Sequence, residues 1–245
     1  LEDSFTKINS GIPSPTVEIQ GRPFDLEMHE RPDQSVADVY AEVGTSHERT
    51  LIFTSGKAEI SHIIEQLTKQ LEDQERGSSS NVEFRILHAD LNPTMKNYAV
   101  SPNPLGKRVV IVATPVAMSG ITIPGMTCVI TDGTINRPEL DEETISGTRR
   151  GYLAKSEIIQ ELGRAGRDVD GGVGYIVKPT SIFEDEAREK GKIITEEDMP
   201  YVPFDKREPF GPPEIYNTNL RSVALGIAAN GYQFSDVTEY LPHPV

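Results

Sequence analysis

Two arginines three residues apart, Arg164 and Arg167, are the residues best suited to chemistry in this sequence. They belong to the segment QELGRAGR at positions 160–167, where Gly163 and Gly166 each stand directly before an arginine. Guanidinium groups keep their charge near neutral pH and offer forks of donors that match phosphate oxygens. Glycine has no side chain, so another backbone or a phosphate can approach closely. The segment predicts a site that stabilises charge on a transferring phosphoryl group.

A purely structural interpretation competes with this one. For an isolated G-R-x-G-R motif, a solvated helix face with glycines that only break the helix is the more common explanation. The surrounding order favours the phosphate site. An apolar strand runs into Thr114, a loop V-A-M-S-G-I-T-I follows, a further strand ends at Asp132 and Gly133, and Gln160 precedes the arginines.

The alternation of these segments predicts the fold class. Short apolar runs at 50–54, 82–87, 108–113 and 128–131 read as strands, and residues 58–71 carry apolar side chains at helical spacing. Strands that are apolar on both faces and separated by helices are typical of a parallel sheet with helices on both sides. We expect an α/β core.

The motifs resemble those of a known family when they are taken in order. They are similar to motifs of the second RecA-like domain of superfamily 2 helicases, in the DEAH-box and viral RNA helicase group. The matching segments are a first strand pair at 18–27, motif IV at 50–60, LHADL at 87–91, motif V at 112–123, motif VI at 160–167 and a winged-helix opening at 213–220.

The resemblance implies a domain plan. Residues 1–16 are expected to form an interdomain linker, residues 17–180 the second RecA-like domain, and residues 181–245 an acidic connector with the start of a winged-helix-like segment. Residues 134–154 are expected to form the strand-separating hairpin of the family.

The resemblance also implies a nucleotide site. Arg164 and Arg167 would contact the γ-phosphate, with Arg167 as the arginine finger and Gln160 orienting the attacking water. Gly163 and Gly166 would permit the approach. The motif V loop would line the nucleotide side of the same site through Ser119, Gly120 and Thr122.

An RNA-binding edge is implied by the remaining motifs. Thr114 would donate a hydrogen bond to an RNA phosphate, and Lys57 would supply one local positive charge. The other expected contacts are Ser55, Gly56, His88, Ala89 and Asp90. The competing interpretation is that Thr114 caps a turn and that Ser55 with Gly56 only starts the following helix.

The sequence contains no complete G-x-x-x-x-G-K-[ST] motif and no D-E-x-H motif. We therefore expect ATP or another NTP with Mg²⁺ to be bound mainly by an N-terminal RecA-like domain of the same parent chain. The chain alone is expected to be inactive, whereas the parent enzyme would hydrolyse NTP and unwind RNA. Because Thr134 follows Asp132 and Gly133 where DEAH enzymes carry a base-stacking aromatic residue, we expect broad NTP use.

Composition limits the other possibilities. With 38 acidic and 24 basic residues the net charge is -14, so contact with single-stranded RNA must be local rather than a bulk electrostatic effect. There is one cysteine, and the five histidines are scattered, so a protein-ligated metal site is not expected. Neither a signal peptide nor a membrane-spanning run is apparent, and an intracellular, cytoplasmic location is expected, in a host cell if the protein is viral.

Two alternatives stay open at this point. The chain could be a non-catalytic RNA- or protein-binding module that keeps the RecA-like fold. It could also be the domain of a double-stranded DNA translocase of the same superfamily. Residues upstream of Leu1 with a P-loop would favour the helicase, and higher affinity for duplex DNA than for single-stranded RNA would favour the translocase.

Overall fold

A computed structural model describes residues 25–75, 81–104, 106–115, 121–140, 145–166, 171–180, 199–212 and 220–233. The chain divides into two compact units. The larger unit comprises Pro23–Arg137 and Thr148–Pro212, and the smaller unit comprises Leu1–Arg22, Pro138–Gly147 and Pro213–Val245. The predicted linker at 1–16 and the acidic stretch at 181–198 lie outside the described residues.

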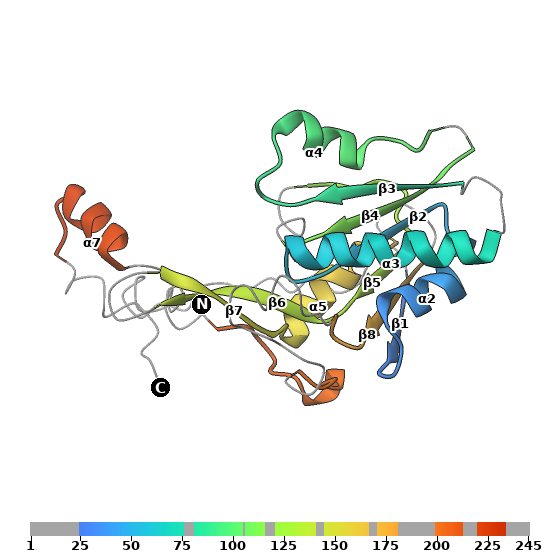
Figure 1. The fold of residues 1–245 in the computed structure, drawn as a ribbon. Helices are drawn as coiled ribbons and strands as arrows, with labels where there is room; N and C mark the ends of the chain where they lie inside the picture. The colour runs from blue at the N-terminus through green and yellow to red at the C-terminus, as the bar shows by residue number, and fades with distance from the viewer. Residues whose placement is uncertain are drawn as a thin grey trace. The chain divides into compact units, whose positions relative to one another are not determined.

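A six-stranded sheet forms the centre of the larger unit (Figure 1). Its order is β1-β8-β5-β2-β4-β3, and every neighbouring pair is parallel. The strands are β1 (Leu26–Arg31), β2 (Arg49–Phe53), β3 (Val82–Leu87), β4 (Arg108–Ala113), β5 (Cys128–Thr131) and β8 (Gly172–Val177). This arrangement confirms the predicted parallel α/β core.

Helices cover both faces of the sheet because the central strands are apolar on both faces. In β2, Ile52 packs in one hydrophobic cluster with α2 (Val36–Val43) and α3 (Lys57–Glu75). Leu51 and Phe53 pack in the other cluster with α4 (Pro93–Val100) and α5 (Lys155–Leu162). All three β2 side chains are fully buried. Burial of each contributes about 1.5–3 kcal/mol relative to exposure.

Side-chain caps fix the starts of two of these helices. Ser35 accepts a hydrogen bond from the Asp38 amide, and Asp38 accepts one from the Ser35 amide in return, which forms a capping box at α2. Asn92 accepts from the Met95 amide and Pro93 occupies the first turn of α4. These caps fix the residue at which each helix begins.

A two-stranded sheet follows β5 and consists of β6 (Thr134–Leu140) and β7 (Ile145–Tyr152). Residues 134–137 of β6 and 148–152 of β7 belong to the larger unit, and residues 138–140 and 145–147 belong to the smaller one. The pair lies within the predicted hairpin at 134–154, and its strand-separating role stays a prediction. Residues 199–212, which include the 3-10 turn η3 (Phe204–Lys206), return to the start of α5, where the Lys155 amide donates to the Glu208 carbonyl at 2.9 Å.

The smaller unit contains one described helix, α7 (Leu220–Ala229), which lies within the stretch at 181–245 that was expected to hold the start of a winged-helix-like segment. Residues 213–219 of the expected winged-helix opening lie outside the described residues. Among the helices that the structure describes, none has the length and apolar character needed to cross a bilayer.

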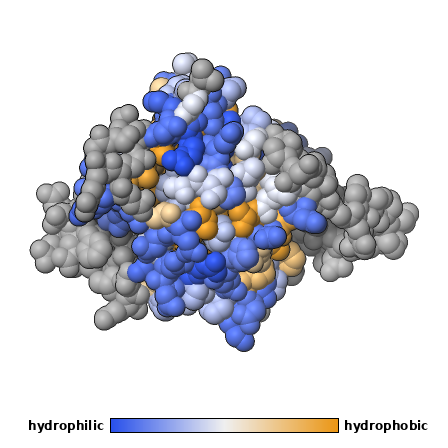
Figure 2. All heavy atoms as spheres, turned by 90° about the vertical axis from the view of Figure 1, so that its right-hand side faces the viewer, coloured by the Kyte–Doolittle hydropathy of each residue, from blue (hydrophilic) through white to orange (hydrophobic). Residues whose placement is uncertain are grey.

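Parallel strands give the sheet two unlike edges. The carboxyl ends of all six strands meet at one edge and their amino ends at the other. The face toward which the amino ends point is mostly hydrophilic, with a small apolar patch near its centre (Figure 2). In open α/β sheets ligands bind outside the carboxyl ends of the strands. The carboxyl edge is therefore the first place to look for a site.

Candidate nucleotide and nucleic-acid site

Three of the predicted RNA-binding segments leave adjacent strands at the carboxyl edge. Ser55 to Lys57 follow β2, Thr114 follows β4, and His88 to Asp90 follow β3. The sheet hydrogen bonding continues past the strand ends, because the Thr54 amide donates to the Ala113 carbonyl at 3.0 Å. The Thr114 amide likewise donates to the Leu87 carbonyl at 3.1 Å. The structure thus brings these segments side by side in the order β2, β4, β3.

The positive charge of Lys57 is paired in this structure. Its Nζ lies 2.5 Å from Oδ2 of Asp90, and both side chains are well exposed. The Lys57 ammonium holds the pKa of the Asp90 carboxyl below its usual value, first through the hydrogen bond and then through its charge. Nearby, Lys96 of α4 donates to the Ala89 carbonyl at 2.7 Å. An incoming phosphate would therefore compete with Asp90 for Lys57.

Ser55 faces inward rather than toward the edge. Its side chain is buried, and its hydroxyl donates to Oε1 of Glu59 at 2.9 Å. A Cβ on Gly56 would lie 2.7 Å from the Glu59 carboxylate and from the Asn136 amide, so a larger residue would force these side chains to shift. The Ser55 hydroxyl is thus committed to the helix start, and this loop can offer backbone amides and the Lys57 ammonium to an RNA strand.

A buried polar network below this edge was not predicted from the sequence. The guanidinium of Arg150 on β7 lies 3.7 Å from Oε1 of Glu59 and 3.4 Å from Oδ2 of Asp132. Thr54 donates to the same Asp132 oxygen at 2.9 Å. Nothing in the local sequence singles out Arg150, because its partners come from distant segments.

The turn after β5 is held on two sides. Thr134 is 1% exposed and its hydroxyl donates to Oδ1 of Asp132 at 2.8 Å, so its side chain faces the interior. Gly133 has a φ of 64°, and a Cβ there would lie 2.6 Å from Nη2 of Arg207. Arg207 in turn donates to the Gly133 carbonyl at 2.7 Å. The residue after this turn offers no exposed stacking face.

Arg164 lies directly beyond the end of α5, and its side chain is buried against the chain that leads into β5. It is 7% exposed, and its Nη1 donates to the carbonyl oxygen of Ile121 at 2.6 Å. Ile121 is adjacent to Thr122, the described member of the three nucleotide-facing residues expected in motif V. This contact joins the ends of the two motifs.

Gly166 is required by the backbone around it. Its φ is 66°, and a Cβ would lie 3.0 Å from the Gly172 amide nitrogen and 3.1 Å from the Gly171 carbonyl carbon. Its own amide donates to the Met126 carbonyl at 2.9 Å. The space that a side chain at position 166 would need is therefore occupied by the turn that enters β8. Gly163, buried at the end of α5, and Gln160, exposed on α5, complete the described part of motif VI.

The predicted site residues form two groups. The expected RNA contacts lie at the carboxyl edge of β2, β4 and β3. Arg164 and Gly166 lie around the chain at Ile121 and Met126, which precedes β5. The connection between β4 and β5 starts in the first group and ends in the second. Arg167, Ser119 and Gly120 lie outside the described residues.

Glu161, next to Gln160, is a fully buried carboxyl group. Burial raises its pKa well above the usual 4.5, and the nearby Asp132 and Glu157 act in the same direction. The hydroxyl of Thr131 donates to its Oε2 at 2.6 Å, which partly opposes this shift. The glutamate therefore ties α5 to the end of β5, and its burial favours the neutral form of the carboxyl group.

A hollow of about 600 Å³ lies at the opposite, amino edge of the sheet. Its lining includes Asp25, Glu27 and Glu48, together with His47 and Thr127. The ring of His47 is 2.9 Å from the Thr127 hydroxyl, and burial lowers the pKa of this histidine. Three carboxylates and a histidine that favours its neutral form make this hollow a poor site for a polyphosphate.

Comparisons with known sequences identify a family that matches this chain. The family described as helicase conserved C-terminal domain matches residues 34–169, which is more than half of the chain. ATP-dependent RNA helicase DHX33 of Drosophila melanogaster is 29% identical over 196 residues, which cover 76% of this chain and 24% of that protein. ATP-dependent RNA helicase HrpA of Escherichia coli is 28% identical over 232 residues, covering 89% and 16%. The chain thus spans about a quarter or less of these relatives.

Solved structures share the fold. The crystal structure of the E. coli DExH-box NTPase HrpB has a TM-score of 0.69 with this chain at 22% identity, and the match covers 99% of this chain and 28% of that one. The parallel sheet and its covering helices are therefore RecA-like. Taken with the family match, this shows that the chain belongs to the helicase conserved C-terminal domain family, as the C-terminal helicase domain of a superfamily 2 helicase.

Proposed function

We propose that this domain works within an NTP-dependent RNA helicase, where it contributes motif V and motif VI contacts to single-stranded RNA and to the γ-phosphate of an NTP. The observation that carries the proposal is the connection between β4 and β5. It begins at Thr114, beside the other predicted RNA contacts, and ends beside Arg164 and Gly166. The connection between β4 and β5 can therefore contact both the RNA and the NTP.

The RNA-binding part of the proposal is supported by the groups at the carboxyl edge. Backbone amides of the loops after β2 and β3, the Thr114 hydroxyl and the Lys57 ammonium suit phosphate oxygens. They are local contacts, as a chain with a net charge of -14 requires. We propose that Lys57 exchanges Asp90 for an RNA phosphate when a strand binds.

The nucleotide-binding part assigns roles to motif VI. Arg167 would contact the γ-phosphate as the arginine finger, and Gln160 would orient the attacking water. Arg164 would hold the motif V connection in place through Ile121 and contribute its charge nearby. Mg²⁺ would neutralise phosphate charge when bound. The described residues supply a buried guanidinium and a tight glycine turn but no cradle for a whole triphosphate, so we propose that an N-terminal RecA-like domain binds most of the nucleotide.

Broad NTP use is part of the same proposal. The side chain of Thr134 is buried and bonded to Asp132, so it cannot stack on a base from this position. Discrimination between bases would then have to come from other residues. The full-length protein is expected to hydrolyse all four NTPs at comparable rates, and a strict preference for ATP would contradict this.

The test compares the 245-residue chain with the full-length protein. Phosphate release should be stimulated by single-stranded RNA in the full-length protein and should not exceed the buffer rate for the chain alone. Turnover by the chain alone would overturn the proposed division of labour. Tighter binding of duplex DNA than of single-stranded RNA would instead identify a DNA translocase, and RNA binding without any turnover by the full-length protein would identify a non-catalytic module.

A further inference from the structure

Arg150 on β7 is the centre of the buried network below the carboxyl edge. Its side chain is 4% exposed, and so is that of Glu59, while that of Asp132 is fully buried. Besides these two carboxylates, the guanidinium donates to the Thr134 hydroxyl from Nη2 at 3.1 Å and from Nε at 3.3 Å. One cation thus bridges three segments: the start of α3, the turn after β5 and β7.

The partners of Arg150 lead directly to the loops of the proposed RNA edge. Glu59 accepts the hydrogen bond from Ser55, in the loop between β2 and α3. Asp132 accepts the hydrogen bond from Thr54, the residue that follows β2. The orientation of residues 54–56 therefore depends on two carboxylates, and Arg150 holds both of them.

The charges explain why an arginine is needed. Two carboxylates buried near each other repel, and a buried carboxylate without a partner is costly. A planar guanidinium holds its donors in fixed directions, and here it contacts both carboxylates at once, through a hydrogen bond to Asp132 and an ion pair with Glu59. Removal of this one cation would leave Glu59 and Asp132 without their shared partner.

We propose that Arg150 is a positioning residue that holds the loop at 54–57 and the turn at 132–134 in the arrangement that accepts single-stranded RNA, and links both to β7. This inference rests on the proposed RNA role of the edge. Because the side chain of Arg150 is buried, Arg150 would act on the loops through Glu59 and Asp132 and not by touching RNA itself. A displacement of β7 would then shift the loops at the carboxyl edge, and a displacement of those loops would shift β7.

The chain offers a matched control in Arg149. It precedes Arg150 on the same strand and is exposed, in keeping with the alternation of strand side chains. Arg149→Ala removes the same charge without touching the network. The test variants are Arg150→Met, which keeps the length of the side chain, and Arg150→Lys, which keeps the charge but loses the fork.

The first readout is amide hydrogen exchange in the full-length protein, which does not depend on RNA. Arg150→Met should speed exchange at residues 54–59 and 132–134 by about 10-fold or more, as expected for loss of a charged hydrogen-bonded partner, with central strands β2 and β4 unchanged. Arg149→Ala should leave exchange unchanged. Equal acceleration throughout the sheet, or none at these loops, would overturn the inference. If Arg150→Met does not fold, Arg150→Lys provides the same test.

The second readout is affinity for a single-stranded RNA oligonucleotide, measured on variants whose folding is confirmed by circular dichroism. Arg150→Met should weaken binding by about 10-fold, and Arg150→Lys should fall between it and the unchanged protein. The KM for NTP without RNA should stay the same. Wild-type affinity in a folded Arg150→Met protein would reject the inference. If the unchanged protein does not bind RNA, the proposed function is rejected instead. The hydrogen-exchange measurement would still decide whether Arg150 positions the loops.

Discussion

Nη1 of Arg164 donates a hydrogen bond of 2.6 Å to the carbonyl oxygen of Ile121, so the end of motif VI is tied to the end of the motif V connection. This bond from a charged donor to a backbone carbonyl is a structural contact. Arg164 therefore holds the two motifs together in this structure, and Arg167 is the residue that we propose as the arginine finger. The two arginines are expected to behave differently when each is replaced.

Arg164→Ala should lower the free energy of unfolding of the chain. Loss of a hydrogen bond from a charged donor, with a carbonyl left unsatisfied, costs about 1.5–3 kcal/mol. Equilibrium urea unfolding followed by circular dichroism measures this. Arg164→Lys, which retains a donor, should recover part of the loss. An unchanged unfolding midpoint for Arg164→Ala would show that the contact with Ile121 contributes nothing to stability.

Gly166→Ala should destabilise the chain through its backbone. The φ of 66° is unfavourable for alanine, and the new Cβ would lie 3.0 Å from the Gly172 amide nitrogen. A loss of roughly 1–2 kcal/mol or more is expected from strain in the left-handed region combined with the close contact. Thermal unfolding provides the measurement. Gly226→Ala is the control, because Gly226 lies within α7 and a Cβ there would meet nothing within 4 Å.

Lys57 and Asp90 should affect RNA binding in opposite directions. Lys57→Ala removes the cation and should weaken binding of single-stranded RNA by the full-length protein, and the slope of log K against log salt should shrink by about one ion. Asp90→Asn removes the competing carboxylate and should strengthen binding.

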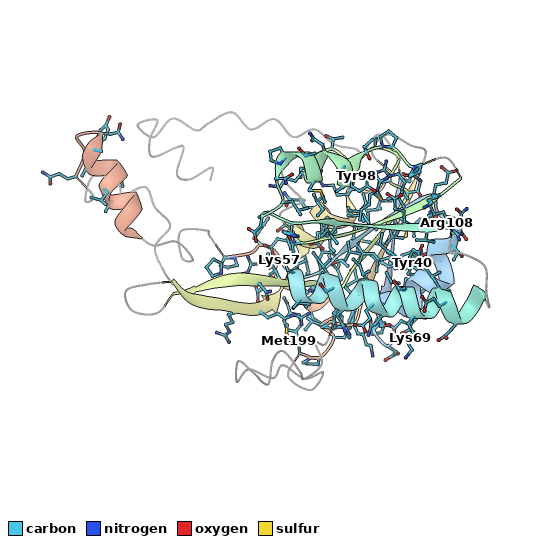
Figure 3. The ribbon with its side chains drawn as sticks, turned by 45° about the horizontal axis from the view of Figure 1, so that its top comes forward. Tyr40, Lys57, Lys69, Tyr98, Arg108 and Met199 are labelled. Atoms are coloured by element: carbon cyan, nitrogen blue, oxygen red, sulfur yellow. The ribbon has the colours of Figure 1, made fainter. Side chains whose placement is uncertain are left out.

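Lys69→Ala is the matched control for the Lys57 variant. Lys57 is the first residue of α3, and Lys69 lies well along the same helix, past its middle (Figure 3); both are exposed. Lys69 is far from the carboxyl edge, so its replacement should leave RNA affinity unchanged. Equal loss from both lysine variants would mean that general charge, and not the edge loop, governs binding.

Glu161 should make stability depend on pH in a defined direction. Its folded-state pKa lies above the usual 4.5 because of burial, so the folded state holds the proton more tightly than the unfolded state. Its contribution to stability is fully present below about pH 4.5 and is lost as the pH rises through the raised folded-state value. Glu161→Gln removes this titration.

The measurement is the free energy of unfolding of both proteins across pH 4.5–8. The difference, unchanged chain minus Glu161→Gln, should fall as the pH rises. A difference that is constant, or that grows with pH, would show that Glu161 is not a protonated buried group. Titrating groups that do not interact with Glu161 are common to both proteins and cancel in the difference.

The sheet could be predicted from the sequence because its central strands are short apolar runs. Residues 108–113 were predicted as a strand and form β4, and residues 128–131 form β5. Burial on both faces produces this signal. The pair β6 and β7 gives no comparable signal, since TINRPEL and ISGTRRGY mix charged and small residues and include Pro138. The only prediction for that segment was the hairpin implied by the family resemblance.

The arrangement of the loops that carry the expected RNA-binding residues could be predicted, but the directions of their side chains could not. The motif positions correctly indicated which loops share the carboxyl edge, because strand order in a parallel sheet follows from the fold. Motif reasoning could not show that the Ser55 hydroxyl points to Glu59, that Arg164 is buried, or that Arg150 joins Glu59 to Asp132. Such contacts depend on packing between segments that are far apart in the sequence.

The most direct test of the central claim is NTP turnover by the full-length protein carrying Arg167→Ala. Loss of a transition-state arginine should reduce turnover on the order of 10³-fold. Affinity for single-stranded RNA and the unfolding midpoint should stay close to those of the unchanged protein. Turnover within a few-fold of the unchanged protein, or a matching loss of folding, would contradict the assignment of motif VI to phosphoryl transfer.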